Sequence, residues 1–163
     1  MVSDVPHYNT LTVKLRANLT LNGTNLITMN RKKLLVVGLL NFACPTCWNQ
    51  ATRFNDLYND LQHKEMTESV VQILLINEKR ARNSYTQSHF QKLRVLQDNE
   101  NDEIIKKLGG KSMDTFVFGR CGYLQFSQHH PDSLLENPKN YQLLLNQIYS
   151  AVKNKRRCQK LCS

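Results

Sequence analysis

The sequence predicts an α/β fold in which helices flank a central mixed β-sheet, and three stretches of the chain carry this prediction. The apolar run Leu34–Leu40 has the length and the Leu and Val content of a strand buried on both faces. Directly after it, apolar residues recur at helical spacing over residues 45–62. A second apolar run, Ser69–Ile76, follows that helix. A strand, a helix and a strand in this order predict a right-handed crossover and two parallel strands.

Two cysteines stand where the first strand enters the helix, in the segment Cys44-Pro45-Thr46-Cys47. Pro45 suits the first helical position because it lacks an N–H group that would have no partner there. The free N–H groups and the positive end of the helix dipole favour a thiolate, so we expect Cys44 to be the acidic, reactive sulfur. Cys47 follows three residues later on the same face, where it can close a short disulfide with Cys44.

A C-x-x-C pair that opens a helix after a buried strand is typical of redox-active proteins. Two alternatives stay open on the residues alone. The pair can be a purely structural disulfide, or it can be half of a zinc site, although no second close pair of Cys or His completes such a site at finger-like spacing. No metal site is predicted elsewhere, and His129 and His130 are interpreted as part of a solvated turn.

The rest of the chain supplies the other elements of a single domain. We expect an edge strand at residues 8–15, a polar connection at 17–30, a helix at 83–92, a strand at 94–97, a short helix at 100–108, a hairpin of strands 115–118 and 123–126, and a terminal helix at 139–153. This order is that of a thioredoxin-like fold. We therefore divide the chain into an N-terminal extension, residues 1–30, that packs on the domain, and a thioredoxin-like domain, residues 31–163.

Length and composition indicate a secreted protein. The 163 residues suffice for a full core, and no apolar run approaches the roughly 18 residues of a membrane-spanning helix. The residues after Met1 are polar and do not form a secretory leader, so we expect a mature region behind an added initiator. The sequons at Asn18 and Asn22 predict surface glycosylation, and together with five cysteines they indicate an extracellular protein.

The net charge is +9, and many of the basic residues are clustered. Clusters of like charge attract polyanions, which for an extracellular protein are glycosaminoglycans or cell surfaces. The sequence contains no zinc-finger or similar motif that would favour nucleic acid. The plainer interpretation is that these side chains only keep the surface solvated. The candidate polyanion-binding residues are Arg31, Lys32, Lys33, Lys153, Lys155, Arg156, Arg157 and Lys160.

Three cysteines lie outside the C-x-x-C segment. Cys121 falls at the turn of the predicted hairpin, where we expect it to be exposed. Cys158 and Cys162 are four residues apart, which on a continuous helix places their Cβ atoms about 6 Å from each other, too far for a disulfide. We therefore expect Cys121 to bond to one of them, which leaves the other for a partner outside this chain.

Several motifs resemble the N-terminal domain of selenoprotein P, over roughly residues 30–163. The similarity covers the apolar strand that enters the C-x-x-C turn, the Ile76-Asn77 strand end, the hairpin segment Phe118–Leu124 and the terminal pair Cys158 and Cys162. In that family the position of Cys44 is typically selenocysteine, so the resemblance implies either a natural cysteine form or a substitution made for expression. The segment Leu40–Cys44 is also similar to the peroxidatic turn of glutathione peroxidases, which implies peroxide as one substrate class.

The sequence departs from thioredoxins at two places. Thioredoxins carry a cis-proline before the hairpin strand, and Asp114 stands there in this chain. They also carry a buried acid six residues before the first cysteine, where this chain has Gly38. We therefore expect Cys47 to lack the usual proton acceptor. Glutathione peroxidases have an Asn-Gln pair at the position of Asn77, and here Glu78 replaces the Gln.

The residues and the resemblance together predict a secreted thiol-disulfide oxidoreductase or thiol-dependent peroxidase. Cys44 is expected to attack a disulfide or a peroxide and Cys47 to resolve the intermediate. No bound cofactor is expected; an external thiol, glutathione or a thioredoxin-like reductase, resets the pair. The alternative is a non-catalytic extracellular module of a selenium-transport protein that binds a glycosaminoglycan or a receptor, with a structural C-x-x-C bridge. The missing proline and acid favour this alternative, and the exposed position of Cys44 opposes it.

Overall fold

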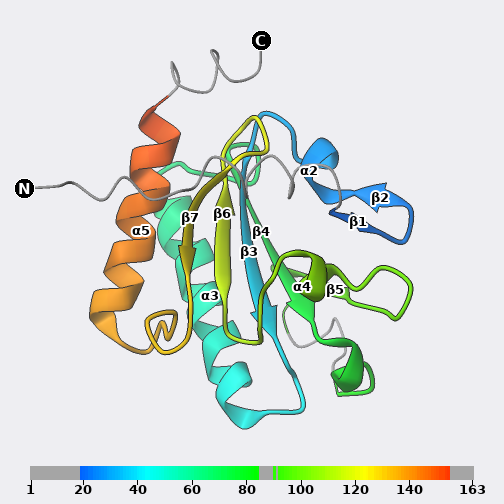
Figure 1. The fold of residues 1–163 in the computed structure, drawn as a ribbon. Helices are drawn as coiled ribbons and strands as arrows, with labels where there is room; N and C mark the ends of the chain where they lie inside the picture. The colour runs from blue at the N-terminus through cyan, green and yellow to red at the C-terminus, as the bar shows by residue number, and fades with distance from the viewer. Residues whose placement is uncertain (1–18, 85–89, 91, 155–163) are drawn as a thin grey trace, which may run out of the picture.

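A five-stranded mixed sheet forms the centre of the computed structural model, which describes residues 19–84, 90 and 92–154. The strand order is β5-β4-β3-β6-β7 (Figure 1). The bounds are Leu34–Leu40 for β3, Val71–Asn77 for β4, Arg94–Gln97 for β5, Thr115–Phe118 for β6 and Leu124–Gln128 for β7. Strands β4 and β5 run parallel to β3, whereas β6 is antiparallel to it. The predicted α/β fold with a mixed central sheet is thereby confirmed.

Helices cover both faces of this sheet. Two long helices, α3 (Pro45–His63) and α5 (Pro138–Lys153), lie side by side on one face (Figure 1). The other face carries the short strands β1 (Thr20–Leu21) and β2 (Thr24–Asn25) and the short helices α2 (Leu26–Met29) and α4 (Ile104–Lys107). A three-residue helix, η1 (Lys79–Ala81), follows β4. None of the helices in the described part of the chain is long and apolar enough to cross a membrane.

The central strand β3 is buried along its whole length, as its composition predicts. Its side chains alternate between two cores, because successive residues of a strand point to opposite faces. Leu34, Val36 and Leu40 pack against α3 and α5. Leu35, Val37 and Leu39 pack under the short elements on the other face. The strand therefore fixes the position of the segment that leaves its carboxyl end, which is the C-x-x-C turn.

Gly38 is the one residue of β3 without a side chain, and the packing of α3 explains it. A Cβ atom at this position would lie 2.7 Å from the ring of Phe54 and 3.0 Å from Leu75. Real Cβ contacts of that length do not occur in a well-packed core. Phe54 thus occupies the space in which thioredoxins hold their buried acid, so no carboxylate fits there.

Two segments differ from the sequence prediction. Residues 19–29 form a small hairpin and one helical turn instead of an irregular connection, because Leu19, Leu21, Leu26 and Ile27 are buried in the second core.

Helix α4 spans Ile104–Lys107 and not residues 100–108. The Asp98 carboxylate accepts hydrogen bonds from the backbone N–H groups of Ile104 and Ile105, and Asn99 caps the turn before them. The strand predicted at 8–15 and most of the helix predicted at 83–92 lie outside the described residues.

Candidate functional site

The C-x-x-C pair lies at the carboxyl end of β3, where α3 begins. Cys44 is the N-cap residue of α3, with φ −106° and ψ 124°, and Pro45 follows at the first helical position. The carbonyl oxygen of Cys44 accepts a hydrogen bond from the N–H of Cys47 at 3.1 Å. No disulfide joins the two cysteines in the structure. Cys44 is half-buried, whereas only 1% of Cys47 is exposed.

The two sulfurs have opposite acid–base character. The pKa of Cys44 is lowered, chiefly because the backbone N–H of Cys47 stabilises the thiolate, with smaller contributions from Thr46. Burial, aided by the negative charges of Cys44 and Glu78 and opposed by the hydrogen bond from the Asn41 N–H, raises the pKa of Cys47 to about 11. Cys44 is therefore the more exposed and more acidic of the two thiols, and Cys47 is protonated at neutral pH.

Asn41 and Met113 hold the buried thiol in place. The backbone N–H of Asn41 donates to Cys47 Sγ at 3.3 Å. Cys47 in turn contacts Met113 Sδ at 3.3 Å. The Cys47 S–H is the donor in this contact and the thioether the acceptor, so the contact favours the protonated thiol. The buried thiol is thus fixed from two sides, at the ends of β3 and of the loop that precedes β6.

Met113, and not Asp114, is the residue that faces the active-site sulfur before the hairpin strand. Its backbone has φ +80°, a left-handed conformation that is uncommon for a residue with a side chain, and its N–H donates to the Leu39 carbonyl at 2.7 Å. The Asp114 carboxylate turns away, toward the N–H of Lys111 and the His129 ring. A cis peptide does occur, but at His130-Pro131, after β7.

Glu78 brings a carboxylate to the pair from the end of the neighbouring strand. Its Oε2 accepts a hydrogen bond from Ser112 Oγ at 2.9 Å and one from Asn41 Nδ2 at 3.4 Å. The usual acid is absent at Gly38, as expected, but Glu78 supplies a negative charge that acts on Cys47 from another strand. Sequence reasoning missed Ser112 and Met113 and gave Glu78 no role, although the carboxyl ends of parallel strands meet at one edge of a sheet.

Asn77, the last residue of β4, holds the loop between β3 and α3 in place. It is fully buried, and its side-chain oxygen accepts a hydrogen bond from the N–H of Phe42 at 3.1 Å. Its amide nitrogen donates to the Ala81 carbonyl and to Gln97 Oε1. Trp48 covers the same loop, because its ring packs edge-on against Phe42 and its Nε1 donates to the Phe42 carbonyl. The segment that precedes Cys44 in the chain is therefore held in one conformation.

Cys121 is disulfide-bonded, and it is buried, with 4% of its surface exposed. The expectation of exposure at the hairpin turn is wrong, since Cys121 is buried beside a small pocket that Ile27, Thr28 and Arg31 also line. The partners predicted for it, Cys158 and Cys162, lie outside the described residues. Asn22 is exposed at the tip of the β1–β2 turn, whereas Asn18 lies outside them.

Four of the predicted polyanion-binding residues lie in the described part of the chain, next to the amino end of β3 or at the end of α5. Arg31, Lys32 and Lys33 lead into the start of β3. The N–H of Lys32 donates to the Arg120 carbonyl at 3.0 Å, and the Arg120 guanidinium donates to the Val152 carbonyl, next to Lys153, at 2.8 Å. The predicted residues Lys155, Arg156, Arg157 and Lys160 lie outside the described part of the chain. No cluster of three or more metal-ligating side chains occurs among the described residues.

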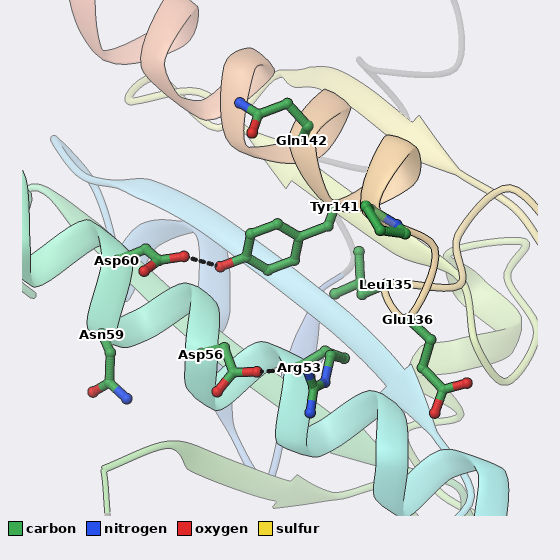
Figure 2. Close-up of a pocket in the computed structure, with 9 residues that line it drawn as sticks. Arg53, Asp56, Asn59, Asp60, Leu135, Glu136, Tyr141 and Gln142 are labelled. Atoms are coloured by element: carbon green, nitrogen blue, oxygen red, sulfur yellow. Dashed lines mark hydrogen bonds and ion pairs between the residues drawn. The ribbon is translucent and has the colours of Figure 1, made fainter.

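A pocket of about 600 Å³ lies between α3 and the start of α5, away from the cysteines (Figure 2). Arg53 and Asp56 form an ion pair across one turn of α3, and the Tyr141 hydroxyl donates to Asp60 (Figure 2). Burial and the Asp60 charge raise the pKa of Tyr141. These side chains satisfy one another, and neither Cys44 nor Cys47 lines the pocket, so it is separate from the redox site.

The difference between the two thiols predicts their order of alkylation. When the reduced protein is treated with iodoacetamide near pH 7, we expect Cys44 to be carboxamidomethylated well before Cys47, because only Cys44 is both accessible and acidic. Peptide mass mapping at successive times measures the order. Faster labelling of Cys47, or equal rates under native conditions, would contradict the assignment.

Comparison with solved structures shows a thioredoxin-like fold. A thiol-disulfide isomerase from Corynebacterium glutamicum aligns with a TM-score of 0.54 and 20% identity, over 77% of this chain and 84% of that one. A thioredoxin-like protein from Porphyromonas gingivalis aligns at 0.58 and 14%, over 78% and 80%. Yeast Sco1 with copper bound aligns at 0.62 and 14%, over 82% and 83%. At these identities the likeness concerns the fold alone.

A family model identifies the chain more closely. The comparison with curated proteins gives no match. The model described as "Selenoprotein P, N terminal region" matches residues 13–162, which is nearly the whole chain. Its span includes the strand β3, the C-x-x-C turn and the β6–β7 hairpin, which are the segments that carry the resemblance in the sequence. The chain therefore belongs to the family of selenoprotein P N-terminal regions.

Proposed function

We propose that this protein is a secreted thiol-disulfide oxidoreductase that uses Cys44 and Cys47. The observation that carries the proposal is the difference between the two thiols at the start of α3. Cys44 is accessible and acidic, whereas Cys47 is buried and protonated. A merely structural bridge needs no such difference. The thioredoxin-like fold supports the same conclusion.

The reaction has two exchange steps. The Cys44 thiolate attacks one sulfur of a substrate disulfide, which forms a mixed disulfide and releases the other sulfur as a thiolate. Cys47 then loses its proton and attacks Cys44 Sγ, so that the Cys44–Cys47 bond forms and the second substrate thiolate leaves. Two electrons pass from the protein to the substrate. An external thiol, glutathione or a thioredoxin-like reductase, returns them to the pair.

The surroundings of the pair favour a disulfide over a peroxide as substrate. A peroxidatic cysteine needs polar groups directed at the peroxide oxygens. Here the Asn77 side chain makes hydrogen bonds to Phe42, Ala81 and Gln97, so both of its ends are engaged in holding the loop. Selenocysteine at position 44 would remain ionised at lower pH than a thiol and would speed the first step without changing this arrangement.

Substitution of each cysteine separates the two steps. We expect Cys44→Ser to abolish reduction of an insulin disulfide, because no other described thiol is accessible and acidic. We expect Cys47→Ser to accumulate a mixed disulfide at Cys44, because the resolving sulfur is missing. Turnover assays and intact mass spectrometry measure both outcomes. Retained turnover in Cys44→Ser would eliminate the proposed function.

A second function, polyanion binding, is favoured by the position of the basic residues. Arg31, Lys32 and Lys33 directly precede β3, and the Lys32 N–H donates to the Arg120 carbonyl. The Arg120 guanidinium in turn donates to the Val152 carbonyl, next to Lys153, so these five basic residues are neighbours. They therefore form one surface, which we call the basic end, and the redox pair is at the opposite end of the same strand. The protein can thus bind an anionic polymer of the cell surface, such as heparin, without covering Cys44.

Charge reversal at the basic end tests this second function. We expect Lys32→Glu combined with Lys153→Glu to elute from heparin at clearly lower salt than the control Lys139→Glu combined with Lys106→Glu, which changes the net charge equally. Lys139 lies at the opposite end of α5 from Lys153. Binding that releases counterions weakens with salt, so the difference should exceed that seen on a plain cation exchanger. Equal elution of the two variants would assign the charge to solubility alone.

A further inference from the structure

The proposed exchange reaction requires that Cys47 lose a proton at the moment it attacks. This thiol is almost completely buried, and its pKa of about 11 leaves little thiolate at neutral pH. The usual solution, a buried acid on the central strand, is blocked in this chain because Phe54 fills the space above Gly38. The site therefore needs a proton acceptor from another element, and this inference rests on the proposed function.

Glu78 has the position for that role. It follows β4 directly, and its Oε2 is held by Ser112 Oγ at 2.9 Å and by Asn41 Nδ2 at 3.4 Å. Asn41 is also the residue whose backbone N–H donates to Cys47 Sγ. One residue therefore contacts both the carboxylate and the thiol. Within the part of the chain that the structure describes, Oε1 of Glu78 has no hydrogen-bond partner, so it is free to take a proton.

The other charged groups around the pair are already engaged. The Asp114 carboxylate accepts hydrogen bonds from the N–H groups of Lys111 and His130 and pairs with the His129 ring. Lys79, the neighbour of Glu78, directs its ammonium to Glu100 and Glu103. The Glu78 charge acts on Cys47, whose pKa it raises.

We propose that the Glu78 carboxylate is the proton acceptor for Cys47 in the resolving step. As Cys47 Sγ attacks Cys44 Sγ, the Cys47 proton passes to Glu78, directly or across one water molecule. The Cys44–Cys47 bond forms, the bond from Cys44 to the substrate sulfur breaks, and its electron pair leaves on that sulfur. The leaving thiolate then takes the proton from Glu78 or from solvent. Ser112 and Asn41 act as positioning residues for the carboxylate.

The variant Glu78→Gln distinguishes proton transfer from a structural role. Glutamine has nearly the same shape, and its side-chain oxygen still accepts the Ser112 hydrogen bond. Removal of the negative charge by itself lowers the pKa of Cys47 and would speed the attack. Only the loss of a proton acceptor slows it. The two roles therefore predict opposite changes in the rate of the second step.

The experiment follows the reaction of the reduced full chain with 5,5′-dithiobis(2-nitrobenzoate). Attack by Cys44 releases one thionitrobenzoate, and attack by Cys47 releases the second. The trace of a Cys44→Ser/Cys47→Ser variant is subtracted to remove release by any other thiol. At pH 7 we expect Glu78→Gln to leave the first release unchanged and to slow the second about 10²-fold, the lower end of the effect of a positioned base. Glu78→Asp should restore part of the rate.

The pH dependence provides a second readout. In Glu78→Gln the second rate should rise about tenfold per pH unit toward the Cys47 pKa, because it then follows the thiolate fraction. In the unsubstituted protein it should rise less steeply. Glu136→Gln, a charge change of the same kind in the separate pocket between α3 and α5, should alter neither release. An unchanged or faster second release in Glu78→Gln, or equal slowing of both, would overturn this inference. Absence of a second release in the unsubstituted protein would instead overturn the proposed function.

Discussion

The unequal environments of two thiols are the constraint on which the site depends. Cys44 ends an extended segment at the start of α3, where backbone N–H groups stabilise its thiolate. Cys47 lies one turn further on and is enclosed by Asn41 and Met113, so that burial favours its protonated form. A shift of one pKa unit corresponds to about 1.4 kcal/mol between the two forms of a thiol. The backbone at the helix start therefore lowers the pKa of Cys44, and the residues around Cys47 exclude water from it and raise its pKa.

The sheet places this helix start with little freedom. Strand β3 is buried on both faces and packs against two separate cores, so its carboxyl end cannot shift without disturbing both. Asn77 ties the following loop to the end of β4, and the same strand end carries Glu78. At the other end of β3 the chain exposes a basic surface that reaches across to α5 through Arg120. The cysteine pair and this group of basic residues thus lie at opposite ends of one strand, so the two proposed functions do not compete for the same surface.

The sequence was sufficient to predict the strands and helices that have strong periodicity, and the roles of Cys44 and Cys47 follow from the position of a helix start. It was not sufficient where several distant residues converge. Met113 takes its place beside Cys47 through a left-handed backbone conformation that no local pattern of hydrophobicity indicates. Glu78 looked like an ordinary charged residue after a strand, because Ser112 and Asn41, which orient it, are far away in the chain. Cys121 was expected to be exposed because a glycine-flanked turn is usually solvated, whereas it is buried beside a small pocket that Ile27, Thr28 and Arg31 also line.

The reduction potential of the Cys44–Cys47 couple tests most directly whether this environment serves exchange chemistry. Equilibration of the protein with glutathione buffers of graded ratio, followed by quantification of the oxidised and reduced forms, gives the value. An accessible, stabilised thiolate favours the reduced form, so we expect a potential of roughly −200 to −270 mV, the range of glutaredoxins and thioredoxin. A potential below about −300 mV would be that of a structural disulfide and would contradict the account.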